Sequence, residues 1–122
     1  MFSDVHHIGY RVKSLDESIA AYQRAFGSEL LGRSGAIAFM RTGDTMVELM
    51  EPADKTMFDS TDAPILHHIG YLVPDLAAAV KELESKGLVI LDKTPRVNFM
   101  GWKIVYFEGG PGIGVGLHVT EV

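Results

Sequence analysis

The chain of 122 residues contains no cysteine, which excludes disulfide bonds and any metal site built from thiolates. It also lacks an excess of basic residues, and its formal net charge of -5 argues against a nucleic-acid-binding surface. No apolar run reaches the length that spans a membrane, and residues 1–4 lack the basic and apolar segments of a secretory signal. We therefore expect a cytoplasmic protein with neither a nucleic-acid nor a membrane partner.

The composition is that of a folded protein. Hydrophobic residues make up 47% of the chain, and charges of both signs are interspersed. A chain of this length buries a core of useful size. We expect residues 1–122 to form one domain.

One five-residue segment occurs twice, as His6-His7-Ile8-Gly9-Tyr10 and as His67-His68-Ile69-Gly70-Tyr71, half a chain length apart. Every histidine except His118 lies in these two segments. Such a repeat predicts two copies of one small unit, which we place at residues 1–55 and 63–122. Equivalent histidines in both copies suggest a shared polar site, and a metal ion is the first candidate.

The first half has the pattern of a strand, a helix and three more strands. Alternation from Val5 to Val12 predicts a strand that places His7 opposite its apolar face. Ser14 is a good N-cap for the helix that follows, and Gly27 is a natural stop. The three further strands are expected at residues 29–31, 36–41 and 45–51.

The second half repeats this order after a polar, irregular linker at residues 52–64. A strand at residues 66–73 precedes a helix that Asp75 caps and Gly87 ends. The remaining strands are expected at residues 88–91, 102–107 and 115–121, with an extended loop before the second of them. The glycine-rich segment 108–114 does not lead into a helix, so a phosphate-binding loop is disfavoured.

Four residues lie on the less apolar face of the first or last strand of their half: His7, Glu48, His68 and His118. If the halves pair through a pseudo-twofold axis, these side chains converge. Imidazoles with one carboxylate suit a divalent ion such as Zn, Ni, Co, Mn or Fe, with open positions for water or substrate. A buried Glu48 among apolar neighbours also needs a partner.

Histidines in a small β protein also have an ordinary structural role, hydrogen-bonded to backbone groups. Duplicate placement of His7 and His68 is hard to obtain from packing alone, so these two favour the metal site. For His118 the two interpretations are evenly balanced. His6 and His67 share the face of the core residues, and we interpret them as structural.

These patterns resemble the vicinal oxygen chelate superfamily of glyoxalases, bleomycin resistance proteins and extradiol dioxygenases. That superfamily is built from paired βαβββ modules. The resemblance therefore implies an α+β fold whose two tandem modules form a cup-shaped, barrel-like curved sheet with helices outside. It covers nearly the whole chain. The matching segments are His7-Ile8-Gly9, residues 43–52, His68-Ile69 and residues 101–107, the last of which is most similar to methylmalonyl-CoA epimerases and lactoylglutathione lyases.

The resemblance implies that the metal ligands are His7, Glu48, His68 and the residue at position 118. The resembled enzymes usually have a glutamate at this last position, tied to proton transfer, whereas this chain has His118. An imidazole still binds a divalent ion through a neutral nitrogen, but it is a different base. The first half is also shorter between Leu30 and Ala36 than in the epimerases.

We expect a metal-dependent isomerase, epimerase or lyase that acts on a small carbonyl or thioester substrate. Two substrate oxygens would chelate the metal, which stabilises the developing enediolate as a Lewis acid. Glu48 or His118 would be the base and the conjugate acid. Epimerisation needs two such groups on opposite faces of the carbon, and these two residues come from opposite halves.

Two other functions stay open. One is a resistance protein that binds a small molecule without metal, although relatives of that kind usually lack the ligands. The other is an extradiol-type dioxygenase, which uses two histidines and one carboxylate on iron(II). We also expect a homodimer, because each half alone exposes an apolar edge.

Overall fold

The structure is a computed structural model, and it describes Phe2 and residues 4–122; Met1 and Ser3, which fall in the predicted first module, lie outside the described residues. The chain divides into two compact units. The N-terminal unit is His7–His67, and the C-terminal unit consists of His68–Val122 with the residues that precede His7.

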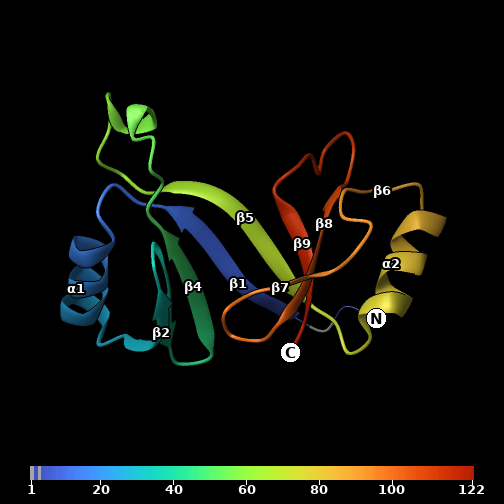
Figure 1. Cartoon of the computed structure of the whole chain (residues 1–122), viewed down its shortest axis with the longest axis horizontal. Helices are drawn as coiled ribbons and strands as arrows, with labels where there is room; N and C mark the ends of the chain where they lie inside the picture. The colour runs from blue at the N-terminus through green and yellow to red at the C-terminus, as the bar shows by residue number, and fades with distance from the viewer. Residues whose placement is uncertain (1, 3) are drawn as a thin grey trace. The chain divides into compact units, whose positions relative to one another are not determined.

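The N-terminal unit is a βαβββ module with a four-stranded sheet. The strands follow the order β2-β3-β4-β1, in which β1 and β4 are parallel and the other pairs are antiparallel. Figure 1 shows its elements in blue to green. They are β1 (Asp4–Arg11), α1 (Leu15–Phe26), β2 (Glu29–Ser34), β3 (Ile37–Thr42), β4 (Thr45–Met50) and the short 3-10 helix η1 (Thr56–Phe58).

The C-terminal unit repeats this plan with strand order β5-β9-β8-β6, and β7 pairs with β8 outside this order. Here β5 and β9 are parallel, as β1 and β4 are in the other unit. Its elements run from yellow-green to red in Figure 1. They are β5 (Ile65–Leu72), α2 (Leu76–Ser85), β6 (Val89–Ile90), β7 (Arg96–Val97), β8 (Lys103–Glu108) and β9 (Leu117–Glu121).

Each sheet buries one face beneath its own helix. Because side chains alternate along a strand, every second residue joins this core and its neighbours face the other way. The buried core under α1 consists of Val12, Leu15, Ile19, Ala38, Met40 and Leu49. The buried core under α2 consists of Val73, Leu76, Ala79, Leu83, Val105, Phe107, Leu117 and Val119.

The helices begin at the predicted caps. Ser14 accepts a hydrogen bond from the backbone N–H of Glu17 at 3.3 Å, and Asp75 accepts one from Ala78 at 3.0 Å. Helix α1 ends at Gly27, whose φ of +63° is the left-handed conformation that favours glycine. Within the described part of the chain, neither helix is long and apolar enough to cross a membrane.

A glutamate on the end of the last strand holds the start of the helix in both units. Glu51 Oε1 accepts a hydrogen bond from the backbone N–H of Leu15 at 2.7 Å, and Glu121 Oε2 accepts one from Leu76 at 2.8 Å. The hydrogen bond from Leu15, followed by one from Lys55, holds the pKa of Glu51 below its ordinary value. The two units are therefore equivalent in their contacts as well as in their strand order.

The predicted α+β class with two βαβββ modules is confirmed, with two local corrections. A segment predicted to be a loop contains the two-residue strand β7, which pairs with β8. The segment predicted to be an irregular linker contains η1, where the apolar ring of Phe58 is only 3% exposed. The single domain at residues 1–122, with modules at 1–55 and 63–122, stays a prediction.

Candidate metal centre

The N-terminal unit contains a histidine–carboxylate pair on the sheet face turned away from α1. Leu49 belongs to the core under the helix, so its neighbour Glu48 points to the opposite face. His7 lies on the adjacent strand β1, and its Nε2 is 3.4 Å from Glu48 Oε1. His7 is 1% exposed and Glu48 is 9% exposed. The buried carboxylate of Glu48, for which we expected a partner, is thus paired with His7, one of the predicted site residues.

Phe39 lies next to both members of this pair. It is fully buried and lies opposite Glu48 in the β3–β4 register. Its ring meets the ring of His7 edge to face, with centroids 5.5 Å apart and planes at 86°. Phe39 was not among the predicted site residues. The two-residue turn at Gly43 and Asp44 sets this register and was the signal that could have revealed it.

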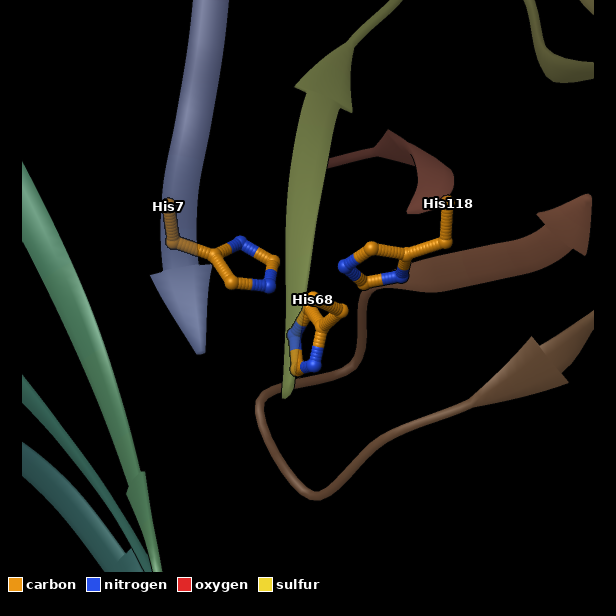
Figure 2. Close-up of side chains that lie close together, drawn as sticks. All are labelled: His7, His68 and His118. Atoms are coloured by element: carbon orange, nitrogen blue, oxygen red, sulfur yellow. The ribbon is translucent and has the colours of Figure 1, made fainter. Parts of the chain in front are cut away.

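The C-terminal unit contains a pair of histidines in the corresponding positions. His68 on β5 and His118 on β9 are 1% and 0% exposed. Their rings are perpendicular, with centroids 4.5 Å apart, and ring nitrogens of the two lie within 4.8 Å of each other. Figure 2 shows both rings turned toward the same space and also labels His7 on β1. Gly70 lies opposite His118 and contributes no side chain to this space.

Tyr106 is a second residue of the site that was not among the predicted residues. It lies opposite His118 in the β8–β9 register, the position equivalent to Phe39 in the other unit. The rings of Tyr106 and His118 are stacked, with centroids 4.9 Å apart and planes at 18°. The glycine-rich segment between β8 and β9 does not set a register by its length, so the sequence offered no signal for this pair.

The donor atoms fit a divalent ion of intermediate softness. Two ligand atoms about 2.1 Å from one ion lie about 3.0–3.4 Å apart at tetrahedral or octahedral angles. The His7–Glu48 separation of 3.4 Å matches this spacing. It is longer than the ~2.7–2.9 Å of a strong charge-assisted hydrogen bond. Imidazole nitrogens with a carboxylate oxygen are a donor set that Zn, Ni, Co, Mn and Fe accept.

The structure therefore brings the four predicted site residues together as two pairs, one in each unit. His6, predicted to be structural, is buried with its ring edge against Trp102, the two centroids 4.5 Å apart. His67 is half-buried on β5. That the two pairs form a single site is a proposal, which follows below.

Comparisons with known proteins agree on the fold. A family model described as Glyoxalase/Bleomycin resistance protein/Dioxygenase superfamily matches residues 6–106, a range that includes His7, Glu48 and His68 and ends before His118. The mitochondrial methylmalonyl-CoA epimerase of Dictyostelium discoideum is 25% identical over 128 residues, which cover 96% of this chain and 77% of that protein.

Two solved structures share the fold. The crystal structure of methylmalonyl-CoA epimerase from Mycobacterium tuberculosis has a TM-score of 0.84 at 22% identity, covering 98% of this chain and 88% of that chain. A variant of the Streptomyces coelicolor methylmalonyl-CoA epimerase, in complex with 2-nitronate-propionyl-CoA, has a TM-score of 0.82 at 20% identity, covering 99% of this chain and 98% of that chain. At these identities the likeness is one of fold alone.

Proposed function

The chain belongs to the glyoxalase/bleomycin resistance protein/dioxygenase superfamily, and on this premise we propose that it is a metal-dependent enzyme that removes and returns a proton next to a carbonyl group. The reaction we propose is epimerisation of a carboxylated acyl thioester of the methylmalonyl-CoA type. The curated relative and the solved structures described above carry the name of that activity, which supports an epimerase over a lyase.

The observation that carries the proposal is the equivalence of the two buried pairs. Each consists of a first-strand histidine and a group three residues before the glutamate that holds the helix. We propose that both pairs bind one divalent ion, with His7, Glu48, His68 and His118 as its ligands. When bound, such an ion acts as a Lewis acid that stabilises negative charge on the substrate oxygens.

Glu48 and His118 have the chemistry for the two proton transfers. A carboxylate has two oxygens, so one is available to take the proton from the carbon while the other is a ligand. The carbon–hydrogen electron pair then moves into the carbonyl group and leaves an enolate. An imidazole that would bind the ion through one nitrogen keeps an N–H on the other, and His118 would give this proton to the opposite face of the carbon. Turnover would leave Glu48 protonated and His118 deprotonated, and proton exchange with water would restore both groups.

Deuterium exchange tests the proposed reaction. The protein, loaded with Co²⁺, is incubated with methylmalonyl-CoA in D₂O, and mass spectrometry measures deuterium at the carbon between the two carbonyl groups. We expect exchange faster than the uncatalysed background, and a decrease of at least about a hundredfold in Glu48→Gln, since acid–base groups contribute this much or more. Exchange no faster than that of the Glu48→Gln variant would contradict the proposal.

Parallel samples decide between this function and the other candidates. The hemithioacetal of methylglyoxal and glutathione tests for lyase activity. Elemental analysis of the purified protein tests the alternatives: stoichiometric iron(II) with oxygen uptake on a catechol would indicate a dioxygenase, and tight binding of small molecules without metal would indicate a resistance protein. The homodimer, the cytoplasmic location and the absence of a nucleic-acid partner stay predictions.

A further inference from the structure

The ring of Tyr106 stacks on the imidazole of His118. On one side of β9 the cross-strand neighbour of His118 is Gly70, which cannot restrain the imidazole. On the other side it is Tyr106, whose ring lies nearly parallel to the imidazole at 4.9 Å. Offset stacking at this distance is a favourable arrangement of two aromatic rings. The imidazole therefore has a stacked ring on the side of β8, in addition to the perpendicular ring of His68.

Tyr106 is also contacted by a cation, Arg96, from the strand β7, which pairs with β8. The guanidinium carbon of Arg96, on β7, lies 5.1 Å from the centroid of the Tyr106 ring. This distance is within the range of a cation–π interaction. The stack thus runs from an exposed guanidinium through the tyrosine ring to the fully buried imidazole of His118.

One carboxylate binds both Arg96 and Tyr106, the first two members of this stack. Asp92 Oδ1 accepts hydrogen bonds from Arg96 Nε at 3.0 Å and is 2.9 Å from Arg96 Nη2. Its other oxygen, Oδ2, accepts a hydrogen bond from the backbone N–H of Tyr106 at 2.9 Å. The Asp92 side chain is only 10% exposed, whereas the Arg96 side chain is 65% exposed. Because Asp92 binds both Arg96 and the backbone of Tyr106, it holds the Arg96 guanidinium over the Tyr106 ring.

The N-terminal unit offers an internal comparison. Phe39 occupies the position equivalent to Tyr106, but its cross-strand neighbour is the carboxylate of Glu48. A carboxylate has no ring to stack on. Phe39 meets His7 edge to face, and Tyr106 meets His68 in the same way with centroids 5.9 Å apart. The stacked support is thus a feature of the unit in which the last-strand group is an imidazole.

We infer that Tyr106, clamped by Arg96 and Asp92, is a positioning residue that fixes the ring plane of His118 for metal binding. The inference rests on the proposed metal site, and it explains how the C-terminal unit supports an imidazole at the position where the N-terminal unit has the carboxylate of Glu48. Tyr106 also meets His68 edge to face, with centroids 5.9 Å apart, but its stacked contact with His118 is the closer one. Most of its contribution should therefore disappear when position 118 has no ring.

A double-mutant cycle with Co²⁺ alone as the probe tests this dependence. Tyr106→Leu removes the ring, and Tyr106→Phe keeps it; both are made with His118 and with His118→Glu, and Co²⁺ affinity is measured by calorimetric titration. With His118 we expect Tyr106→Leu to weaken Co²⁺ binding about three- to tenfold, the range of one aromatic pair, and Tyr106→Phe to restore it to within about twofold. In His118→Glu we expect Tyr106→Leu to change the affinity less than about twofold.

Phe39→Leu is the matched control. It removes the equivalent ring of the other unit, which contacts His7 and not position 118. We expect it to weaken binding by the same factor in both backgrounds. The visible absorption of bound Co²⁺ provides a second measurement: Tyr106→Leu should alter the spectrum clearly more when residue 118 is histidine than when it is glutamate.

Equal losses from Tyr106→Leu in both backgrounds, or no loss in either, would overturn the inference. If Tyr106→Leu does not fold, Arg96→Met, at a side chain 65% exposed, replaces it: the Co²⁺ spectrum should change with His118 only, and an unchanged spectrum overturns the inference. His118→Ala distinguishes a failure of the proposed metal site from a failure of the inference about Tyr106. Unchanged Co²⁺ affinity in His118→Ala refutes the proposed metal site itself, whereas a loss there with none in Tyr106→Leu refutes only the role of Tyr106.

Discussion

At the scale of single residues, the proposed site has an unusual balance of charge. Three neutral imidazoles and one carboxylate give the ligands a total charge of -1, so a bound divalent ion would keep a net charge of +1. A glutamate at position 118 would reduce that net charge to zero. Because the local field of a bound cation governs how strongly it polarises oxygens, His118 should favour binding of anionic substrate oxygens.

The first-strand histidines should both be necessary for metal binding. We expect His7→Ala and His68→Ala each to weaken metal affinity by at least about tenfold, because each removes a ligand and losses around metal sites reach this size. His67→Ala, which alters the half-buried neighbour of His68, is the control and should keep its metal. Elemental analysis after dialysis measures the content. Full metal content in both His7→Ala and His68→Ala would exclude the proposed site.

The residues found from sequence and those missed differ in the kind of signal they leave. His7 and His68 were predicted because a repeat marks equivalent positions, and Glu48 because a carboxylate on an apolar strand needs a partner. Tyr106, Asp92 and Arg96 are related to the site only through strand register and loop geometry. A glycine-rich connection allows many registers, so the sequence does not determine which residue faces His118.

At the scale of elements, the helices were predictable because their ends carry local chemistry. Ser14, Asp75 and Gly27 satisfy backbone groups or adopt conformations that few other residues suit. Strand β7 was not predictable, since two residues cannot show alternation. Glu51 and Glu121 each lie three residues after a candidate ligand, which is visible in the sequence. Their hydrogen bonds to the start of each helix are tertiary contacts, which the sequence does not reveal.

The hydrogen bond between Glu51 and helix α1 should make stability depend on pH. The pKa of Glu51 is lowered in the folded protein, chiefly by the backbone N–H of Leu15. The ionised carboxylate therefore stabilises the fold above the pKa of the unfolded chain, ~4.3 for a glutamate. This contribution is lost as the pH falls through the lower pKa of the folded state.

We expect Glu51→Gln to lower the melting temperature at neutral pH, and this difference from the parent protein should shrink as the pH falls below ~4. Thermal unfolding followed by circular dichroism between neutral and acidic pH measures it. Lys55→Met is the control, because Lys55 is the other partner of the same carboxylate, at 2.9 Å. A difference between Glu51→Gln and the parent that stays constant over the whole range would show that the charge of Glu51 is not the cause.

At the scale of the whole molecule, the fold follows from duplication. Each unit pairs its first and last strands in parallel and packs one helix against one sheet face. The repeat predicted two copies of one unit, and the family resemblance implied the α+β class. The partition into compact units begins at His7 and at His68, the two residues that the repeat also singles out as candidate ligands.

If one ion takes ligands from both units, metal binding should stabilise the whole chain. A ligand that binds only the folded state stabilises it by about 2.7 kcal/mol when its free concentration is 100 times the Kd. For a chain of this length we expect the melting temperature to rise by about 10 °C with Co²⁺ at that concentration. Substitutions in either unit, His7→Ala or His118→Ala, should each reduce this rise by about half or more, while His67→Ala should retain it. A rise that His7→Ala reduces and His118→Ala leaves unchanged would mean that the ion is bound by the N-terminal unit alone.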